Sequence, residues 1–276
     1  MKIIEEKTVS KTGNRDTCED RYCVTGHYAC VIDGATNVSG RIYNGLTPGQ
    51  IASGVIAKTI PTLPPDADIS EIVKSINDNL IHYYKAHGIY DSILENPFSC
   101  PTASMVLYSK SRHTIWMIGD CQCMIDDKWY TNAKIVDDII ANIRSFVLEV
   151  ELQRGKTIEE LMKKDTGHEA VRSFKRMQYY LQNTEVETQY SYIALTGFEF
   201  NLDSIETLYV DPVAKYLVLA SDGYPGLKPT LEETEKELEY ILKNDPLCFR
   251  EYKLGKGLIE GNVSFDDRTY VKVKLD

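Results

Sequence analysis

Long apolar segments are missing from this 276-residue sequence. No hydrophobic run approaches the roughly 18 residues that a membrane-spanning helix needs, so we expect no membrane partner. Residues 1–6 (MKIIEE) also lack the apolar core of a secretory signal peptide and carry acids where such a peptide has none. We therefore expect a cytoplasmic protein.

Clustered positive charge is scarce as well. The chain has 31 Lys and Arg residues against 41 Asp and Glu, which gives a formal net charge of −10. Its few neighbouring basic residues, at Lys163-Lys164 and between Arg172 and Arg176, lie among acids at helical spacing and are typical of a solvated helix face. Because an acidic surface repels phosphodiester backbones, we expect no nucleic-acid partner.

The seven cysteines and five histidines form no familiar reactive pattern. Cys121-Gln122-Cys123 is one pair short of a zinc site. No cysteine is followed by five residues and an arginine, which excludes the phosphate-binding loop of cysteine phosphatases. His82 and His87 lie five residues apart, so they would not share one face of a helix and are not at metal-ligand spacing. We expect reduced thiols and histidines on the surface or partly packed.

Repeats, low-complexity tracts and Ser/Gly-rich linkers are absent, so we predict one domain over residues 1–276. A capping residue three positions before Glu or Gln predicts four helix starts, at Thr47, Asp68, Thr157 and Thr230. A further helical segment is predicted at about residues 134–183, with breaks near Gly155 and Gly167.

Short apolar runs predict the strands, at residues 22–25, 28–32, 104–108, 115–118, 205–210, 216–220 and 269–275. Several are close enough to pair as hairpins, as residues 102–108 do with 115–118. Clustered strands and separate helices favour an α+β fold with antiparallel sheets over a parallel, doubly wound one.

Acidic residues recur where these strands end or begin, at Glu19-Asp20, Asp33-Gly34, Gly119-Asp120, Ser221-Asp222-Gly223 and Asp266-Asp267. In antiparallel sheets the ends of some strands lie beside the starts of others, so all five places can meet at one rim. A single Asp-Gly is commonly a plain turn. Carboxylates packed together repel one another unless cations neutralise them, and ligands that are all oxygen suit Mg²⁺ or Mn²⁺.

Six motifs resemble, in order, those of the PPM family, the type 2C Ser/Thr protein phosphatases, in a bacterial-like form. They are Arg15-Asp16-Thr17-Cys18-Glu19-Asp20, Val31-Ile32-Asp33-Gly34, Pro101-Thr102-Ala103, Ile118-Gly119-Asp120, Leu219-Ala220-Ser221-Asp222-Gly223 and Asp266-Asp267-Arg268-Thr269. The resemblance spans residues 10–275. It implies a four-layer αββα sandwich, in which two central antiparallel sheets are flanked by helices.

The resemblance further implies a centre of two Mn²⁺ or Mg²⁺ ions at one end of the sandwich. Asp33 would bridge both ions. Glu19 and the carbonyl of Gly34 would complete one site, and Asp222 and Asp266 would hold the other. Two such ions activate water and offset phosphate charge during in-line attack, so no protein nucleophile is needed.

Three more residues take roles through the same resemblance. Asp20 would orient water bound to the metal, and Asp120 would help to bind a third, weaker ion. Arg15 would grip the substrate phosphate, a task that suits its planar, bidentate guanidinium group.

The chain departs from the family pattern after Asp33-Gly34. Ala35-Thr36-Asn37 stands where many relatives have His-Gly-Gly, so the histidine proposed as general acid is missing, as it often is in bacterial relatives. Tyr224-Pro225-Gly226 lacks the acid that usually follows the Ser-Asp-Gly motif, which counts against the third ion.

We therefore expect a monomeric phosphatase that acts on phosphoserine or phosphothreonine in the protein targets of a Ser/Thr kinase. Two alternatives stay open. One is a pseudophosphatase that binds phosphoprotein with little or no turnover, although none of the core metal acids is lost here. The other is a metal-dependent hydrolase of a small phosphorylated metabolite.

Overall fold

The computed structural model describes residues 1–275, in which ten strands form two sheets of five. The first sheet has the order β1 (Lys2–Val9), β10 (Arg268–Lys274), β9 (Tyr216–Ala220), β6 (Gln122–Ile125), β7 (Lys128–Thr131). The second has the order β2 (Arg21–Val24), β3 (Tyr28–Gly34), β4 (Ala103–Ser109), β5 (Thr114–Ile118), β8 (Glu206–Tyr209). Every neighbouring pair in both sheets is antiparallel, which confirms the predicted class.

The two sheets pack face to face, and β3 shows why its sequence is apolar throughout. Its side chains alternate between two sides, as those of any strand do. Ala29 and Val31 lie in the core between the sheets, with Leu219 and Val271 of the first sheet. Tyr28, Cys30 and Ile32 face the opposite way, into a second core. Both faces of β3 are therefore buried.

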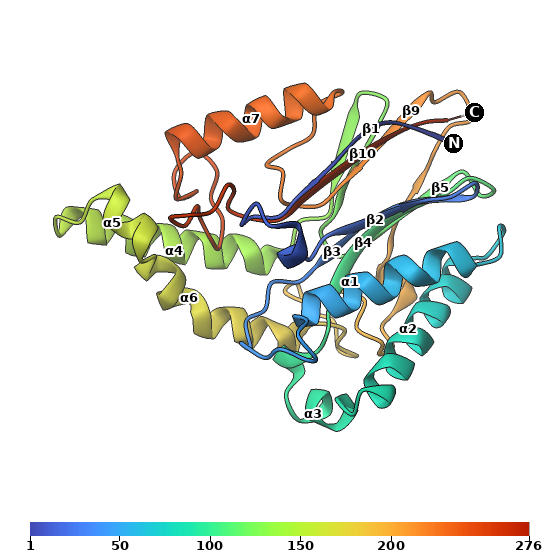
Figure 1. The fold of residues 1–276 in the computed structure, drawn as a ribbon, viewed down its shortest axis with the longest axis horizontal. Helices are drawn as coiled ribbons and strands as arrows, with labels where there is room; N and C mark the ends of the chain where they lie inside the picture. The colour runs from blue at the N-terminus through green and yellow to red at the C-terminus, as the bar shows by residue number, and fades with distance from the viewer. Residues whose placement is uncertain (276) are drawn as a thin grey trace.

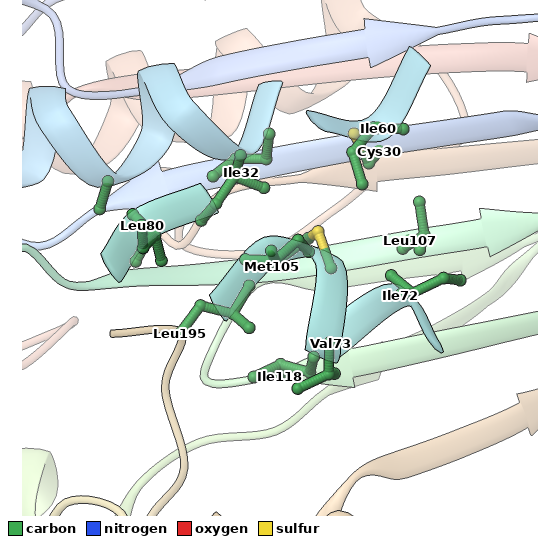
Figure 2. Packing of buried hydrophobic residues seen from close by; sticks show 14 of the residues in the cluster. Cys30, Ile32, Ile60, Ile72, Val73, Leu80, Met105, Leu107, Ile118 and Leu195 are labelled. Carbon is green, nitrogen blue, oxygen red and sulfur yellow. The ribbon is translucent and has the colours of Figure 1, made fainter. Parts of the chain in front are cut away.

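Helices cover the outer face of each sheet (Figure 1). Helices α1 (Pro48–Thr59) and α2 (Ile69–Ala86) pack on the second sheet, where Ile72 and Leu80 of α2 share a core with Ile32 of β3 (Figure 2). Helix α7 (Leu231–Asn244) packs on the first sheet through Leu238, in a third core. The order helix, sheet, sheet, helix is the predicted four-layer sandwich.

The remaining helices are short or lie at one end of the sheets. They are α3 (Tyr90–Glu95), α4 (Ile135–Gln153), α5 (Ile158–Lys163), α6 (Thr166–Met177) and five 3-10 turns: η1 (Arg15–Thr17), η2 (Ile60–Thr62), η3 (Pro97–Ser99), η4 (Gln178–Leu181), η5 (Leu202–Ser204). Helices α4 to α6 stand at the end of the sandwich opposite both termini (Figure 1). Among the residues described, no helix combines the length and the apolar character that crossing a bilayer requires.

Both predicted breaks in the helical segment are confirmed. The first break follows α4 at Gly155, which has a φ of +96°. The second falls at Lys164 and Asp165, near Gly167, where Asp165 caps α6 by accepting the N–H of His168 at 2.7 Å. Gly167 lies inside α6, where a Cβ would come within 2.8 Å of Leu148.

All four predicted helix starts are confirmed. Thr47, Asp68 and Thr157 form complete capping boxes, in which the side chain three residues later bonds back to the cap. Thr230 accepts the N–H of Glu233 at 3.3 Å, but the Glu233 carboxylate accepts the Thr230 hydroxyl instead of the backbone N–H.

The sequence patterns do not predict β1, β6 and β7. Strand β1 carries Lys2, Glu5, Glu6 and Lys7 among its eight residues and is partly exposed along its length, so no apolar run marks it. Strands β6 and β7 are four residues each and turn at Asp126, whose φ is +49°. The seven cysteines are free, as expected, and six of them are buried.

Candidate functional site

The acids at the strand ends meet at one end of the sandwich. Glu19 and Asp20 lie directly before β2, and Asp33 lies near the end of β3. Strands β2 and β3 belong to the second sheet. Asp222 follows β9 and Asp266 precedes β10, both in the first sheet. The charges of Asp20, Asp222 and Asp266 all act on Asp33. The structure therefore gathers these five carboxylates from both sheets.

Three of these carboxylates lack protein partners that neutralise them. Asp20 is 1% exposed; its Oδ2 accepts the hydroxyl of Ser221 at 2.6 Å, whereas its Oδ1 has no hydrogen-bond partner. Asp33 and Asp222 form a hydrogen bond with each other across the two sheets. Asp33 and Asp222 are partly buried, and like charges in such contact favour a shared proton or a bound cation.

The pKa values of this trio follow from the same environment. Burial, followed by the charge of Asp222, raises the pKa of Asp33 well above its usual range. Burial raises the pKa of Asp222 to about 7, with Asp120 and Asp266 adding to the effect. Burial also raises the pKa of Asp20 to about 7, against the hydrogen bond from Ser221.

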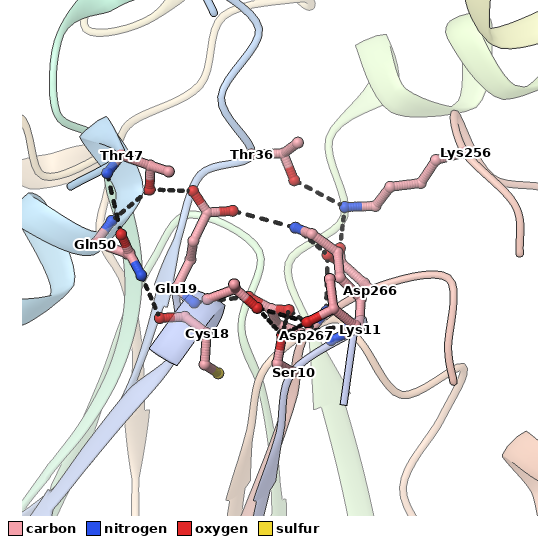
Figure 3. Close-up of polar contacts among 12 residues, drawn as sticks. Ser10, Lys11, Cys18, Glu19, Thr36, Thr47, Gln50, Lys256, Asp266 and Asp267 are labelled. Atoms are coloured by element: carbon pink, nitrogen blue, oxygen red, sulfur yellow. Dashed lines mark hydrogen bonds and ion pairs between the residues drawn. The ribbon is translucent and has the colours of Figure 1, made fainter. Parts of the chain in front are cut away.

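The other two carboxylates, Glu19 and Asp266, are paired with lysines (Figure 3). The ammonium group of Lys11 lies 3.1 Å from Glu19 Oε2 and 3.5 Å from Asp266 Oδ1. Lys256 forms an ion pair with Asp266 Oδ2 and donates to Thr36 Oγ1 at 3.1 Å. Although burial opposes it, Lys256 and Lys11 together hold the pKa of Asp266 below its usual range.

Asp267 fixes the backbone on which this half of the site is built. Its Oδ1 accepts the N–H of Lys11 at 2.7 Å, and its Oδ2 accepts the N–H of Glu19 at 2.6 Å. The hydroxyl of Thr47, which caps α1, donates to Glu19 Oε1 at 2.5 Å. The chain before β2, the start of α1 and the start of β10 are thus held together.

Gly34 lies where the end of β3 passes close to this frame. A Cβ at Gly34 would collide with the carbonyl of Gly49 in α1 and would lie 2.7 Å from the carbonyl of Glu19. Only glycine permits this approach, which leaves the Gly34 backbone beside the carboxylates.

Asp120, predicted to help bind a third ion, already has strong partners. Its Oδ2 forms an ion pair with Lys134 at 2.6 Å, and its Oδ1 accepts the hydroxyl of Ser104 at 2.5 Å. Although burial opposes it, these partners lower the pKa of Asp120 below its usual range. An ion at Asp120 would have to compete with the Lys134 ammonium group.

Arg15 lies in η1 and is exposed. Within residues 1–275 its guanidinium group forms no hydrogen bond or ion pair, and so none with the carboxylates. The structure places Arg15 four residues before Glu19 with its side chain free to meet a ligand.

Only some of the five carboxylates are free to bind a divalent cation. As the side chains stand, no group of three or more His, Cys, Asp or Glu residues in the described chain is arranged to hold an ion. Nevertheless, the unpartnered Oδ1 of buried Asp20 and the contact between Asp33 and Asp222 provide oxygen ligands that a hard cation would satisfy. Glu19 and Asp266 would accept an ion only if ammonium groups withdrew.

Sequence patterns did not identify Lys11 and Lys256 as part of the site. Neither belongs to a motif. Lys11 meets Asp266, and Lys256 meets Thr36, only through contacts between distant parts of the chain. One local signal was available for Lys256, which stands between two glycines. A Cβ at Gly257 would collide with the carbonyl of Leu247, so the chain beside Lys256 is tightly packed.

No protein-family model and no curated protein matches the sequence. Among solved structures, the chain is similar to a serine/threonine phosphatase of Mycobacterium tuberculosis, PstP/Ppp, at 17% identity and a TM-score of 0.46, over 99% of this chain and 97% of that one. The chain is also similar to a PstP catalytic domain in complex with two manganese ions, at 13% identity and a TM-score of 0.49, over 99% of this chain and 97% of that one. A third similar structure is the PPM Ser-Thr phosphatase MsPP of Mycobacterium smegmatis, at 13% identity and a TM-score of 0.47, over the full length of both chains.

At these identities and TM-scores, all below 0.5, function has to be inferred from the residues of the site itself. The arrangement of two antiparallel sheets between helical layers is the one that the sequence resemblance implies. Of these proteins, MsPP is described as a PPM Ser-Thr phosphatase, the family that the six sequence motifs resemble.

Proposed function

We propose that this chain is a metal-dependent phosphatase that hydrolyses phosphoserine and phosphothreonine in proteins. The observation that carries the proposal is the meeting of Asp20, Asp33 and Asp222 from two sheets, with a buried Asp20 oxygen that has no partner. A buried polar atom without a partner costs free energy, which a bound cation would recover. The order of the six sequence motifs supports the same activity.

We assign Asp33, Asp222 and Asp20 to a Mn²⁺ or Mg²⁺ ion, with Gly34, Glu19 and Asp266 around them. When bound, such an ion activates water and offsets the negative charge of a phosphate monoester. Ser221 holds Asp20 through its hydroxyl, and the Thr269 N–H in turn donates to that hydroxyl at 2.9 Å. Asp20 is therefore fixed in position, with Oδ1 free to face the ion and to orient the attacking water.

Arg15 would bind the phosphate from the solvent side. Its side chain is exposed and uncommitted within the described chain, and a planar guanidinium group can hold two phosphate oxygens at once. Ala35 offers no group to protonate the departing oxygen, so that proton would come from water.

The remaining parts of the proposal concern the chain as a whole. Residues 1–276 would act as one domain and as a monomer in the cytoplasm, on proteins phosphorylated by a Ser/Thr kinase. The segment at 134–183 would form a flap beside the site. Its position supports this, because Lys134 contacts Asp120 and Lys175 of α6 lies close to Gly255, next to Lys256.

A second candidate is a protein that binds phosphoprotein without turnover. One observation favours it: Lys11 and Lys256 already neutralise Glu19 and Asp266. A third, a hydrolase of small phosphorylated metabolites, would use the same residues.

A substrate panel separates the three. Purified protein with Mn²⁺ would be given phosphoserine and phosphothreonine peptides, sugar phosphates and nucleotides, and released phosphate would be measured. We expect the highest kcat/KM on the peptides. Asp33→Asn should abolish release, and Asp127→Asn, which removes an exposed acid from the β6–β7 turn, should not. Faster release from a sugar or nucleotide phosphate would favour the metabolite hydrolase, and peptide binding without release would favour the pseudophosphatase.

A further inference from the structure

Ammonium groups occupy one half of the carboxylate centre. Lys11 stands between Glu19 and Asp266, and Lys256 contacts the other oxygen of Asp266 (Figure 3). We infer that the centre holds one divalent ion, at Asp20, Asp33 and Asp222, and that Lys11 takes the place of a second ion. This inference rests on the proposed metal-dependent function and changes the number of ions expected from the sequence.

The hydrogen bonds divide the five acids into two groups. Both oxygens of Glu19 are satisfied, Oε1 by the Thr47 hydroxyl and Oε2 by Lys11. Both oxygens of Asp266 are satisfied as well: Oδ1 accepts the N–H of Asp267 at 2.9 Å and faces Lys11, and Oδ2 binds Lys256. These two acids gain little from an ion.

The second group, Asp20, Asp33 and Asp222, lacks cationic partners in the described part of the chain. Asp20 keeps one buried oxygen without a partner, and Asp33 and Asp222 have each other as partners, which places two acids in contact. No lysine or arginine forms an ion pair with any of the three among residues 1–275. A single cation at this trio would satisfy all of them.

An ion and the Lys11 ammonium group exclude each other. A second ion, held by Glu19, would need Oε2, because the Thr47 hydroxyl already donates to Oε1. Oε2 faces the ammonium group of Lys11 at 3.1 Å, and the same ammonium group lies 3.5 Å from Asp266 Oδ1. Two cations in one partly buried place repel strongly, because water screens them poorly there. The second ion would therefore require Lys11 to leave.

Lys11 is anchored against leaving. Its N–H donates to Asp267 and its carbonyl accepts the N–H of Val263 at 2.8 Å, so the backbone is fixed on both sides. The side chain is only 22% exposed and runs directly to the two carboxylates. Lys256 is held similarly, between Asp266 and Thr36. The ammonium groups are thus part of the folded centre.

The number of Mn²⁺ ions per chain tests this inference. Chelator-treated protein would be titrated with Mn²⁺ by isothermal calorimetry, and the bound ions examined by electron paramagnetic resonance. We expect one ion in the wild-type chain, with the spectrum of an isolated Mn²⁺. Lys11→Met keeps the length of the side chain and removes its charge; it should bind two ions and show spin coupling between them.

Lys253→Met is the matched control, because it removes a charge from an exposed lysine bonded to Asn142, away from the carboxylates. It should bind one ion, as the wild type does. Two ions of similar affinity in the wild type, no bound ion, or one ion in a folded Lys11→Met variant would each overturn the inference. The wild-type count decides the matter even if Lys11→Met does not fold.

The same samples separate this inference from the proposed function. Two ions together with phosphopeptide hydrolysis would overturn the inference and leave the function standing. One ion with no hydrolysis of any peptide would overturn the function and leave the inference standing.

Discussion

Asp33 and Asp222 come from different sheets, and their carboxyl groups are in hydrogen-bond contact. Asp33 lies near the end of β3, whereas Asp222 follows β9, so the contact joins the two sheets at one rim of the sandwich. Two partly buried acids in contact repel each other strongly when both are charged, unless a cation lies between them. This pair therefore makes the folded centre depend on either a shared proton or a bound ion.

Asp222→Asn should abolish turnover at saturating Mn²⁺, because it removes a ligand charge without removing volume. The same change should stabilise the metal-free protein. Since folding raises the pKa of Asp222 to about 7, its charge lowers the free energy of unfolding progressively between pH 3.8 and 7, and the cost is complete above pH 7. The Tm of chelated Asp222→Asn should exceed that of the wild type at pH 8, by at least roughly 2–4 °C.

That stabilisation should disappear at pH 3, where the aspartate is protonated in both states. Asp127→Asn, at an exposed turn, should leave activity and Tm unchanged. More than a tenth of wild-type activity in Asp222→Asn would show that Asp222 is not a ligand.

Arg15→Ala should raise KM for phosphopeptides and weaken inhibition by inorganic phosphate. We expect about a tenfold effect or more, because hydrogen bonds to charged groups contribute roughly 1.5–3 kcal/mol. Mn²⁺ affinity should barely change, since Arg15 makes no contact with the carboxylates. Arg15→Lys should recover only part of the loss, because a point charge cannot form two parallel hydrogen bonds. An unchanged KM in steady-state kinetics would assign Arg15 to the surface turn alone.

Ala35 predicts a steep dependence of rate on the leaving group. General acid help contributes roughly 10²–10⁴-fold and matters most for poor leaving groups such as a seryl alkoxide. Without it, aryl phosphates should react much faster than phosphoserine peptides. A series of phosphate esters of graded leaving-group pKa measures this slope, and Ala35→His should flatten it. A flat slope in the wild type would mean that another group already supplies the proton.

Lys175 of α6 predicts a pH-dependent gain in stability. It is partly buried, faces Lys256 and Arg144, and has no hydrogen bond or ion pair within residues 1–275. Burial, then these two cations, lowers its pKa to about 7 from an ordinary 10.5. Its charge therefore destabilises the fold fully below pH 7, and the cost fades as the pH rises to 10.5.

Lys175→Met should accordingly raise the Tm of the metal-free protein most at pH 6 and little near pH 10. Lys163→Met, at a side chain that is 63% exposed, is the control and should have no such trend. Thermal melts at pH 6, 8 and 10 give the comparison. A shift that did not vary with pH would show that Lys175 keeps its ordinary pKa.

Local signals account for the parts of the fold that the sequence predicts. Capping boxes lie within four residues, so Thr47, Asp68 and Thr157 could be identified as helix starts before any tertiary contact was known. Strand β3 was visible because both of its faces are buried. Strand β1 was not, because charged residues interrupt its apolar ones and its pairing partner, β10, lies at the other end of the chain.

The candidate site divides in the same way. The acids could be placed at one rim because each adjoins a strand end and the sheets are antiparallel. Lys11 and Lys256 could not be placed there from the sequence, because neither lies in a recognisable motif and their contacts with Asp266 form only when the chain folds. The sequence therefore predicted the negative charge of the centre but not the two cations that already neutralise part of it.

Hydrolysis of a phosphothreonine peptide before and after removal of metal tests the central claim most directly. The protein would be treated with chelator, freed of it, and assayed for phosphate release with and without added Mn²⁺, with circular dichroism to show that the fold is kept. The account predicts that release stops in the folded, metal-free protein and returns on addition of Mn²⁺. Undiminished release from the metal-free protein, or no release after Mn²⁺ is restored, would contradict it.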